Sequence, residues 1–461
     1  MKYYIQIFGC HMNYSDAERV QTVLNDLGYK QTQQESQADL IVVLACSVRQ
    51  KAVDRIHGRA NRWNKVKKKR SLITLLTGCL LKTDRKLFDK SFDHIFPITE
   101  LKLLPQLLNK NRTKNNKALS SDLDNYFDIK PQYNSKFQAF IPISRGCNKH
   151  CSYCAVPLTR GKEVSRPPND IIKEVRQLIK NGYKEITLVG QNVNSYGWDF
   201  QGVAINFPQR KVYYHDKDKR VTASKLTVKN PMNFPQLLNK IENIPGKFWI
   251  RFITSHPYDM SDELINVIAQ SKKITSHINL PVQSGSDKIL QSMNRQYAVK
   301  HFKDLITKIR KHIPNAVIST DFIVGFCGET RKDFKDSCQL VKELKFDMAF
   351  ISQYSTRPGT PAANLKDNVS IKEKRLRDQK LTEILSQGSQ ENNNKLINTE
   401  QTVLFEKCSK GYCDGKTYGL KNIRVKSDKD ITGLFATVKV TSATAWSLKG
   451  ALKKRSSPSK Q

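Results

Sequence analysis

Three cysteines stand close together at Cys147, Cys151 and Cys154, just after an apolar, strand-like segment from Phe137 to Ile143. Cysteine thiolates hold iron–sulfur clusters, and three of them leave one iron of a 4Fe-4S cluster open to a small chelating molecule. Structural zinc sites have four ligands, and no fourth cysteine follows nearby in the sequence. The spacing of these loop cysteines therefore favours a cluster with an open iron over zinc or chance.

Three further cysteines, Cys10, Cys46 and Cys79, are widely spaced but share one position, directly after an apolar run that predicts a buried strand. The runs are Tyr3–Phe8, Asp39–Leu44 and Leu72–Leu76. Open α/β sheets bind ligands at the C-terminal ends of their strands, so these strand-end cysteines could converge on one site. The alternative is three unrelated buried cysteines, because cysteine is often buried. Their repeated position favours a second shared cluster.

The elements around the strand-end cysteines predict an α/β domain with a parallel sheet over residues 1–115, because strands and helical patterns alternate. The first helix is expected to have Ser15 as its N-cap, since Glu18 follows at the spacing of a capping box. The polar stretch from Asn109 to Ser121 has no periodicity and predicts a linker.

Residues 133–370 alternate strand and helix patterns, which predicts a complete or partial (β/α) barrel. The predicted strands are Ile186–Val189, Trp249–Phe252, Ile278–Leu280, Val317–Val324 and Met348–Ser352. The predicted helices are Asp170–Lys180, Asp262–Gln270, Val299–Lys311 and Asp333–Leu344. Phe200 to Asn230 breaks the pattern and is expected to be a loop insertion with a hairpin around Val212–Tyr214 and Arg220–Thr222.

Several predicted barrel strands are followed by residues that could bind a ligand, at the end where such barrels place their active sites. They are Gly190, Gln191 and Asn192 after one strand, Ser255 and His256 after the next, then Gln283, and finally the segment from Gly325 to Glu329.

The last part of the chain, residues 396–455, changes to short strands between glycines and polar turns, which predicts a small β-barrel of a type that often binds nucleic acid. The predicted strands are Thr402–Glu406, Gly415–Gly419, Ile423–Lys426 and Ala436–Thr441. A charged helix from Ile371 to Lys395 leads into this part, and the basic stretch from Lys449 to Lys460 is expected to be a disordered tail.

Composition points to an anionic partner. The 78 Lys and Arg against 42 Asp and Glu give a formal net charge of +36, which favours nucleic acid, although a lysine-rich proteome would give a similar surface. No run approaches the ~18 apolar residues of a membrane span, so no membrane partner and a cytoplasmic address are expected. In a reducing compartment, the ten cysteines are expected to be metal or catalytic ligands before disulfides.

Longer motifs spread over most of the chain are specific when taken together. They are Gly9-Cys10-His11-Met12-Asn13 with Asp16, Cys46-Ser47-Val48-Arg49, Gly78-Cys79, Arg145 to Cys154, Arg160 to Pro167, Gly190 to Tyr196, Thr254 to Pro257, Leu280 to Asp287, Met293-Asn294-Arg295 and Tyr354 to Pro361. With these motifs the chain resembles the radical S-adenosyl-L-methionine (SAM) superfamily and, within it, the methylthiotransferase family of the MiaB type. The resemblance implies an N-terminal methylthiotransferase domain, a radical SAM partial barrel and a C-terminal TRAM domain.

The resemblance also implies two 4Fe-4S clusters, one at the loop cysteines, which binds SAM, and an auxiliary one at the strand-end cysteines. One SAM would give a methyl group to sulfur at the auxiliary cluster, and a second would give a 5′-deoxyadenosyl radical that activates C2 of an adenine. For SAM binding it implies Tyr153, Gly190, Gln191, Asn192, Gly325 and Glu329, and for SAM or substrate binding Gln283 and Arg295. No catalytic residue is expected outside the clusters.

The activity implied is the conversion of N(6)-dimethylallyladenosine, next to the tRNA anticodon, to its 2-methylthio derivative. The implied partners are the anticodon stem-loop, an electron donor such as flavodoxin or ferredoxin, and a sulfur source, for a monomeric enzyme. Sister enzymes that act on threonylcarbamoyl-adenosine in tRNA or on a ribosomal-protein aspartate remain alternatives, as does a non-catalytic iron–sulfur protein that binds RNA. The sequence assigns no role to the insertion or to four further cysteines, Cys327, Cys338, Cys408 and Cys413.

Overall fold

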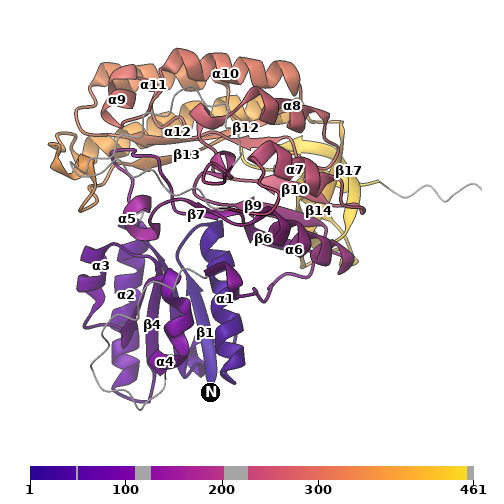
Figure 1. The fold of residues 1–461 in the computed structure, drawn as a ribbon. Coiled ribbons are helices and arrows are strands. Elements are labelled where there is room, and N and C mark those ends of the chain that lie inside the picture. The colour runs from indigo at the N-terminus through magenta and orange to yellow at the C-terminus, as the bar shows by residue number, and fades with distance from the viewer. Residues whose placement is uncertain (48–49, 109–125, 202–226, 454–461) are drawn as a thin grey trace, which may run out of the picture.

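A computed structural model describes residues 1–47, 50–108, 126–201 and 227–453 of the chain (Figure 1). The linker predicted from Asn109 to Ser121 and the hairpin predicted inside the Phe200–Asn230 insertion lie outside these residues. The described parts form an N-terminal parallel sheet, a central barrel of parallel strands and helices, and a small closed barrel at the C-terminal end. The predicted fold class is confirmed.

The N-terminal sheet has the strand order β2-β1-β3-β4-β5, and all of its strand pairs are parallel. Its strands are β1 (Lys2–Ile7), β2 (Lys30–Gln31), β3 (Leu40–Cys46), β4 (Ile73–Cys79) and β5 (His94–Ile95). Its helices are α1 (His11–Asp26), α2 (Gln50–Lys67), α3 (Lys82–Phe88) and α4 (Leu104–Leu108). Strand β3 is buried throughout because helices cover both faces, which explains its unbroken apolar run.

Helix α1 begins at His11, so the N-cap predicted at Ser15 is wrong. The N-cap is Cys10, and Asn13 at the third helical position closes a capping box with it. A cysteine is an unusual N-cap, and the serine four residues inside the helix matched the sequence rule better. As a result, α1 starts directly at a strand-end cysteine.

The central barrel consists of two three-stranded parallel sheets, β10-β9-β6 and β11-β12-β13. An isolated bridge between Ile250 and Ile274 connects them. The strands are β6 (Gln138–Pro142), β9 (Glu185–Val189), β10 (Trp249–Phe252), β11 (His277–Asn279), β12 (Val317–Val324) and β13 (Met348–Gln353). The helices are α5 (Val156–Arg160), α6 (Pro168–Lys180), α7 (Phe234–Glu242), α8 (Asp262–Gln270), α9 (Asp287–Ser292), α10 (Val299–His312) and α11 (Arg331–Leu344). The predicted barrel strands and helices are confirmed to within a few residues.

A short ribbon of β7 (Ser144–Arg145) and β8 (Val164–Ser165) frames the segment that carries the loop cysteines. In Figure 1 the N-terminal sheet lies below the central barrel, and the N-terminus lies at the end of that sheet away from the barrel. The C-terminal ends of β1, β3 and β4, where the strand-end cysteines are found, therefore face the central barrel.

The small barrel closes in the order β14-β15-β16-β18-β17. Its strands are β14 (Glu400–Ser409), β15 (Tyr412–Thr417), β16 (Asn422–Lys426), β17 (Phe435–Ala443) and β18 (Leu448–Leu452). The predicted tail is wrong at its start, because Lys449 lies in β18, which pairs in parallel with β16 and antiparallel with β17. Leu448 is fully buried and its neighbour Lys449 is exposed, as expected for a strand with one face in a core.

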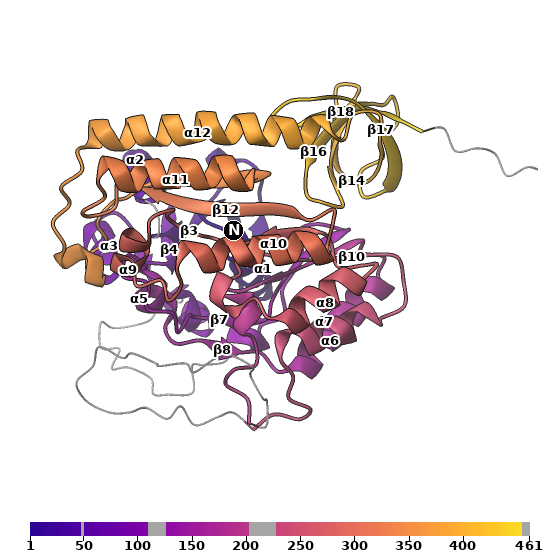
Figure 2. The ribbon, with the colours of Figure 1, turned by 90° about the horizontal axis from the view of Figure 1, so that it is seen from above.

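The long helix α12 (Ile371–Asn394) runs beside α11 and ends at the small barrel (Figure 2). Buried charges fix the small barrel against the central one. Arg251 pairs with Glu185 at 2.6 Å and donates a hydrogen bond to the carbonyl oxygen of Thr417 at 2.9 Å. Lys421 of the small barrel pairs with Asp347 at 2.7 Å. Three of these four ionic side chains are less than one tenth exposed, and Lys421 is only slightly more exposed. The two barrels therefore share a buried polar interface and are not connected by the chain alone.

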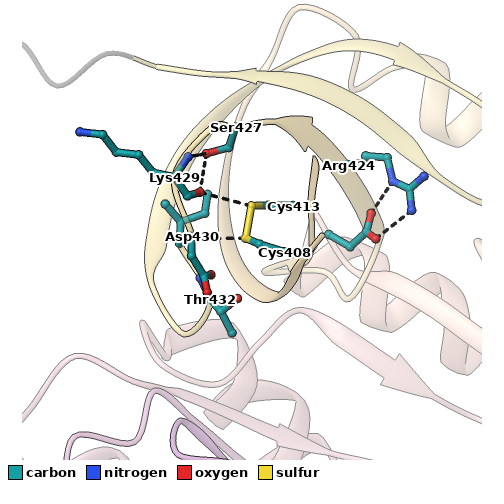
Figure 3. The surroundings of a disulfide bond; sticks show 9 residues. Cys408, Cys413, Arg424, Ser427, Lys429, Asp430 and Thr432 are labelled. Carbon is teal, nitrogen blue, oxygen red and sulfur yellow. Dashed lines mark hydrogen bonds and ion pairs between the residues drawn. A yellow bond between two sulfur atoms is a disulfide. The ribbon is translucent and has the colours of Figure 1, made fainter. Parts of the chain in front are cut away.

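A disulfide joins Cys408 to Cys413, which face each other across β14 and β15 (Figure 3). The backbone N–H of Ile431 donates to the Cys408 sulfur at 3.4 Å, and the Cys413 sulfur lies 3.8 Å from the carbonyl oxygen of Lys429. The expectation that the cysteines serve as ligands before disulfides is therefore wrong for this pair. Register decides the outcome, since directly opposed cysteines on adjacent antiparallel strands are close enough to bond.

Among the described residues, no helix combines the length and the apolar character that crossing a membrane would require.

Candidate functional site

The strand-end cysteines lie at one edge of the N-terminal sheet. Cys46 and Cys79 are the last residues of β3 and β4 and are register partners on these neighbouring strands. Cys10 follows β1, the other neighbour of β3, and caps α1. The structure thus brings together three residues that are up to 69 positions apart in the sequence.

Asn13 connects the chain at Cys10 to the chain next to Cys46 through hydrogen bonds of its side chain. Its side-chain oxygen accepts a hydrogen bond from the Cys10 backbone N–H at 3.2 Å and lies 3.6 Å from the Cys10 sulfur. Its amide nitrogen donates to the carbonyl oxygen of Ala45, next to Cys46, at 3.3 Å. Gly78 is needed beside Cys79, because its φ is +105° and an added Cβ would lie 2.5 Å from the Ala45 oxygen.

Arg160, from helix α5 of the central barrel, reaches this edge. Its Nε donates a hydrogen bond to the Cys79 sulfur at 2.8 Å, and its Nη2 pairs with Asp16 of α1 at 2.5 Å. Both side chains are almost completely buried. Asp16 and Arg160 stand in motifs noted in the sequence, but their pairing could not be read from it, because 144 positions separate them.

The thiol of Cys79 is in an environment that opposes a free thiolate. Burial raises its pKa, the Arg160 guanidinium lowers it, and the nearby charges of Cys46 and Cys10 raise it again. Three neighbouring cysteines, two of them buried, would repel one another as thiolates, and they fit a cationic iron centre because metal ions stabilise deprotonated thiols.

The loop cysteines lie between β7 and α5, and each of their sulfurs accepts one N–H hydrogen bond at 3.4 Å. The donors are the Lys149 backbone for Cys147, Nη1 of Arg295 for Cys151 and the Val156 backbone for Cys154. Burial raises the pKa of Cys147 well above its usual value and that of Cys154 to about 12. Donors directed at the sulfurs of buried cysteines are the surroundings that iron–sulfur clusters use.

Arg295 was predicted to contact SAM or substrate, and the structure directs its nitrogens at the protein. Besides Cys151, it donates to the Tyr297 hydroxyl through Nε at 2.9 Å and to the Pro281 carbonyl oxygen through Nη2 at 2.5 Å. This geometry favours a role beside the loop cysteines over a direct contact with a ligand.

The loop cysteines are tied to the end of β9. Lys149 pairs with Asp259 at 2.8 Å, and Asp259 accepts a hydrogen bond from the side chain of Asn192 at 2.6 Å. Near these residues, at the C-terminal ends of the barrel strands, several buried polar atoms have no hydrogen-bond partner in the described part of the chain. They are Oγ of Ser144, Oε1 of Gln191, Oδ1 of Asn192 and Oγ of Ser255. Orphaned buried polar atoms fit a polar ligand such as SAM in this place.

Three other residues predicted to bind SAM contact parts of the protein around the predicted site. Tyr153 packs edge-on against Phe326, with ring centres 6.5 Å apart, so it lies beside the loop that begins at Gly325. Glu329 accepts from the backbone N–H of Gly325 at 2.6 Å and pairs with Arg377 of α12 at 2.5 Å, which explains how it shapes that loop. Gly190 lies against Ser144, since an added Cβ would be 2.7 Å from the Ser144 oxygen.

Gln283, also predicted near SAM or substrate, has an unusual backbone. It is buried, its φ is +76°, and its N–H and carbonyl groups pair with β12. A non-glycine residue in this conformation at the end of a barrel strand is a common feature of binding sites.

In the part of the chain that the structure describes, no three His, Cys, Asp or Glu side chains gather around a single metal ion. A 4Fe-4S cluster does not need that geometry, because each of its cysteine ligands binds a different iron.

Comparisons with known proteins agree with these observations. The family model of the radical SAM superfamily matches residues 141–341, and that of the uncharacterized protein family UPF0004 matches residues 2–97. In its fold, the chain is similar to the radical SAM methyltransferase TsrM from Kitasatospora setae, with a TM-score of 0.50 at 10% identity, over 78% of this chain and 74% of that one.

Curated relatives match the chain over nearly its whole length. A tRNA-2-methylthio-N(6)-dimethylallyladenosine synthase of Dictyoglomus thermophilum is 37% identical, over 97% of this chain and 98% of its own. A protein of the same name from Thermoanaerobacter pseudethanolicus is also 37% identical, over 98% of this chain and 92% of its own. The chain therefore belongs to the MiaB family of tRNA-2-methylthio-N(6)-dimethylallyladenosine synthases, within the radical SAM superfamily.

Proposed function

We propose that this protein is a radical SAM methylthiotransferase that adds a methylthio group to C2 of N(6)-dimethylallyladenosine next to the anticodon of tRNA. The observation that supports this most is the pair of three-cysteine groups, one at an edge of the N-terminal sheet and one between β7 and α5, with Arg160 at the end of α5 donating a hydrogen bond to Cys79 of the first group. Relatives at 37% identity carry the name of this activity, and no observation favours the sister substrates.

The two cysteine groups would each hold one 4Fe-4S cluster. Cys147, Cys151 and Cys154 would leave one iron open to SAM, and this cofactor pair would supply the radical chemistry that acts on the adenine. Cys10, Cys46 and Cys79 would hold the auxiliary cluster from which sulfur is transferred. The side-chain oxygens of Gln191 and Asn192 would accept hydrogen bonds from the amino group of SAM, and the Ser255 hydroxyl would donate one to its carboxylate, because these oxygens have no hydrogen-bond partner among the residues that the structure describes.

The chain itself would position the reactants and keep water away. The N-terminal sheet covers the barrel end that carries the cysteine loop, so the reacting adenine would enter between the two parts and be flipped from its loop. The proposed division is 1–115, 133–370 and 396–455, with the last part, a TRAM domain, binding RNA. A flavodoxin or ferredoxin, a sulfur source and a cytoplasmic monomer complete the proposal.

The deciding experiment is mass spectrometry of tRNA nucleosides from cells that lack the gene. We expect 2-methylthio-N(6)-isopentenyladenosine to disappear and its precursor without the methylthio group to accumulate. Complementation by the wild-type gene should restore the product, and complementation by a Cys46→Ala gene should not.

Two other results would contradict the proposal. Loss of the methylthio group from threonylcarbamoyl-adenosine, with isopentenyladenosine unaffected, would assign the sister tRNA activity. Normal tRNA together with loss of a methylthio group from a ribosomal-protein aspartate would assign the protein-modifying one.

A further inference from the structure

Arg160 follows the loop cysteines in the sequence, but in the structure it contacts the strand-end cysteines. It lies six residues after Cys154, at the end of α5, yet its Nε donates to the sulfur of Cys79 at 2.8 Å. The residue is 4% exposed, so this hydrogen bond is shielded from water. A charged donor on a buried sulfur is a strong interaction.

The direction of the Arg160 guanidinium is fixed by its second partner. Asp16 pairs with Nη2 at 2.5 Å, and Asp16 itself accepts a hydrogen bond from the Tyr126 hydroxyl at 2.6 Å and one from Asn13 at 3.4 Å. Held by these contacts, Asp16 prevents the guanidinium from turning away from Cys79. The arrangement is a positioned donor rather than a mobile side chain that happens to lie near a sulfur.

A guanidinium at a cluster ligand has a predictable electrostatic effect. A reduced cluster carries one more negative charge than the oxidised one, and donors to the sulfurs stabilise the reduced form. Arg160 should therefore raise the reduction potential of a cluster at the strand-end cysteines. The carboxylate of Asp16 is close by with the opposite charge, and it should lower the potential.

We propose that Arg160 is a positioning residue that raises the reduction potential of the auxiliary cluster through its hydrogen bond to Cys79, and that Asp16 moderates this effect. The proposal rests on the proposed function, because it takes the strand-end cysteines as cluster ligands. Helix α5, which follows the loop cysteines in the sequence, would then set the reduction potential of the other cluster.

The test isolates the auxiliary cluster in the full-length chain by replacing Cys147, Cys151 and Cys154 with Ala. The parent triple variant and its derivatives are reconstituted without oxygen and titrated with dithionite, and the reduced cluster is followed by electron paramagnetic resonance. The derivatives are Arg160→Gln, Arg160→Lys, Asp16→Asn and, as a control, Arg295→Gln.

We expect Arg160→Gln to lower the midpoint potential, because glutamine is uncharged and its shorter side chain brings the N–H donor less close to the Cys79 sulfur. Arg160→Lys keeps the charge without the planar fork and should give a smaller decrease. Asp16→Asn should raise the potential. Arg295→Gln changes an equally buried arginine whose sulfur partner, Cys151, is absent in this background, so it should leave the potential unchanged.

The outcomes separate the two proposals. If the triple variant binds no cluster, the two-cluster assignment fails. If a cluster forms but Arg160→Gln leaves its potential unchanged, the role of Arg160 is refuted. The role of Arg160 is also refuted if Arg160→Gln and Asp16→Asn shift the potential in the same direction. An electrostatic effect must change sign with the charge that is removed. A loosened contact between the N-terminal sheet and the central barrel would not.

Discussion

Two buried arginines, Arg160 and Arg295, have the same relation to the two cysteine groups, since each donates an N–H to one sulfur. Three neighbouring thiolates would repel one another, and burial of charge without compensation is costly. A guanidinium offsets part of that cost and cannot be deprotonated under ordinary conditions. Charge balance thus explains why arginines, rather than lysines or apolar groups, lie against both groups.

Cys151 is the loop cysteine whose sulfur Arg295 contacts, and it offers a direct test of the SAM-binding cluster. We expect Cys151→Ala to abolish SAM cleavage, because an incomplete ligand set would not hold the open iron. The measurement is release of 5′-deoxyadenosine after anaerobic reconstitution and reduction.

Cys338→Ala is the matched control for this experiment. Cys338 lies on α11, is partly buried and packs at the margin of the barrel core, so its replacement should leave SAM cleavage intact. Continued release of 5′-deoxyadenosine by the Cys151 variant would contradict the ligand role.

The cysteine groups could be predicted from sequence because spacing and strand position carry the information locally. The loop cysteines fall within eight residues, and each strand-end cysteine follows an apolar run. The hydrogen bonds of Arg160 and Arg295 could not be predicted, since both join positions 81 or more apart. Such contacts follow from the packing of whole elements, which no local pattern specifies.

At the scale of elements, hydrophobic periodicity predicted most strands and helices within a few residues, because each buries one face or both faces in a core. The errors have specific causes. Helix α1 starts at a cysteine N-cap that propensity rules rank low, and β18 was hidden by Lys449 and the basic residues after it. Burial alternates from Leu448 to Leu452 in the structure, but Gly450 and Ala451 leave no clear alternation of apolar and polar residues in the sequence.

The disulfide between β14 and β15 gives a prediction at this scale. Ten cysteines, less the two that are bonded, leave eight thiols in the apoprotein. Thiol titration of denatured apoprotein, prepared without reductant, should find eight thiols before reduction and ten after it.

A double variant, Cys408→Ser with Cys413→Ser, is the control and should give eight thiols in both conditions. Ten thiols in unreduced wild-type protein would show that the opposed cysteines remain unbonded in solution.

At the scale of the whole molecule, two clusters require a definite metal content. Anaerobically reconstituted protein should contain about eight irons per chain if both 4Fe-4S clusters form. Replacement of all three strand-end cysteines by Ala should reduce this to about four. A wild-type value of about four, measured by iron and sulfide analysis, would remove the auxiliary cluster from the assignment.

The charge of the small barrel gives a second prediction for the whole molecule. Arg424 and Lys426 are exposed on β16, next to the exposed ring of Tyr412 on β15. Such a face suits RNA, because cations bind phosphates and aromatic rings stack on bases. Replacing both cations with Gln should weaken tRNA binding and lower the salt slope of log Kd by about one to two.

Lys2 and Lys30 provide the control for this charge change. They are register partners at the starts of β1 and β2, opposite the strand ends that the strand-end cysteines follow, and changing both to Gln removes the same charge. The affinity and the salt slope should change less than in the small-barrel variant. An equal effect of both pairs would show that overall charge, and not this face, governs binding.

Closure of the small barrel by β18 has a consequence for biosynthesis. This strand ends at Leu452, and it pairs with both β16 and β17, so the barrel remains open until residues 448–452 have been made and can reach it. Until then, two strands present unpaired edges, which are templates for aggregation. Ribosomal stalling or premature termination just before Leu448 should therefore yield chains whose N-terminal sheet and central barrel are complete but whose small barrel is open and prone to aggregation, which makes them targets for chaperones and proteases.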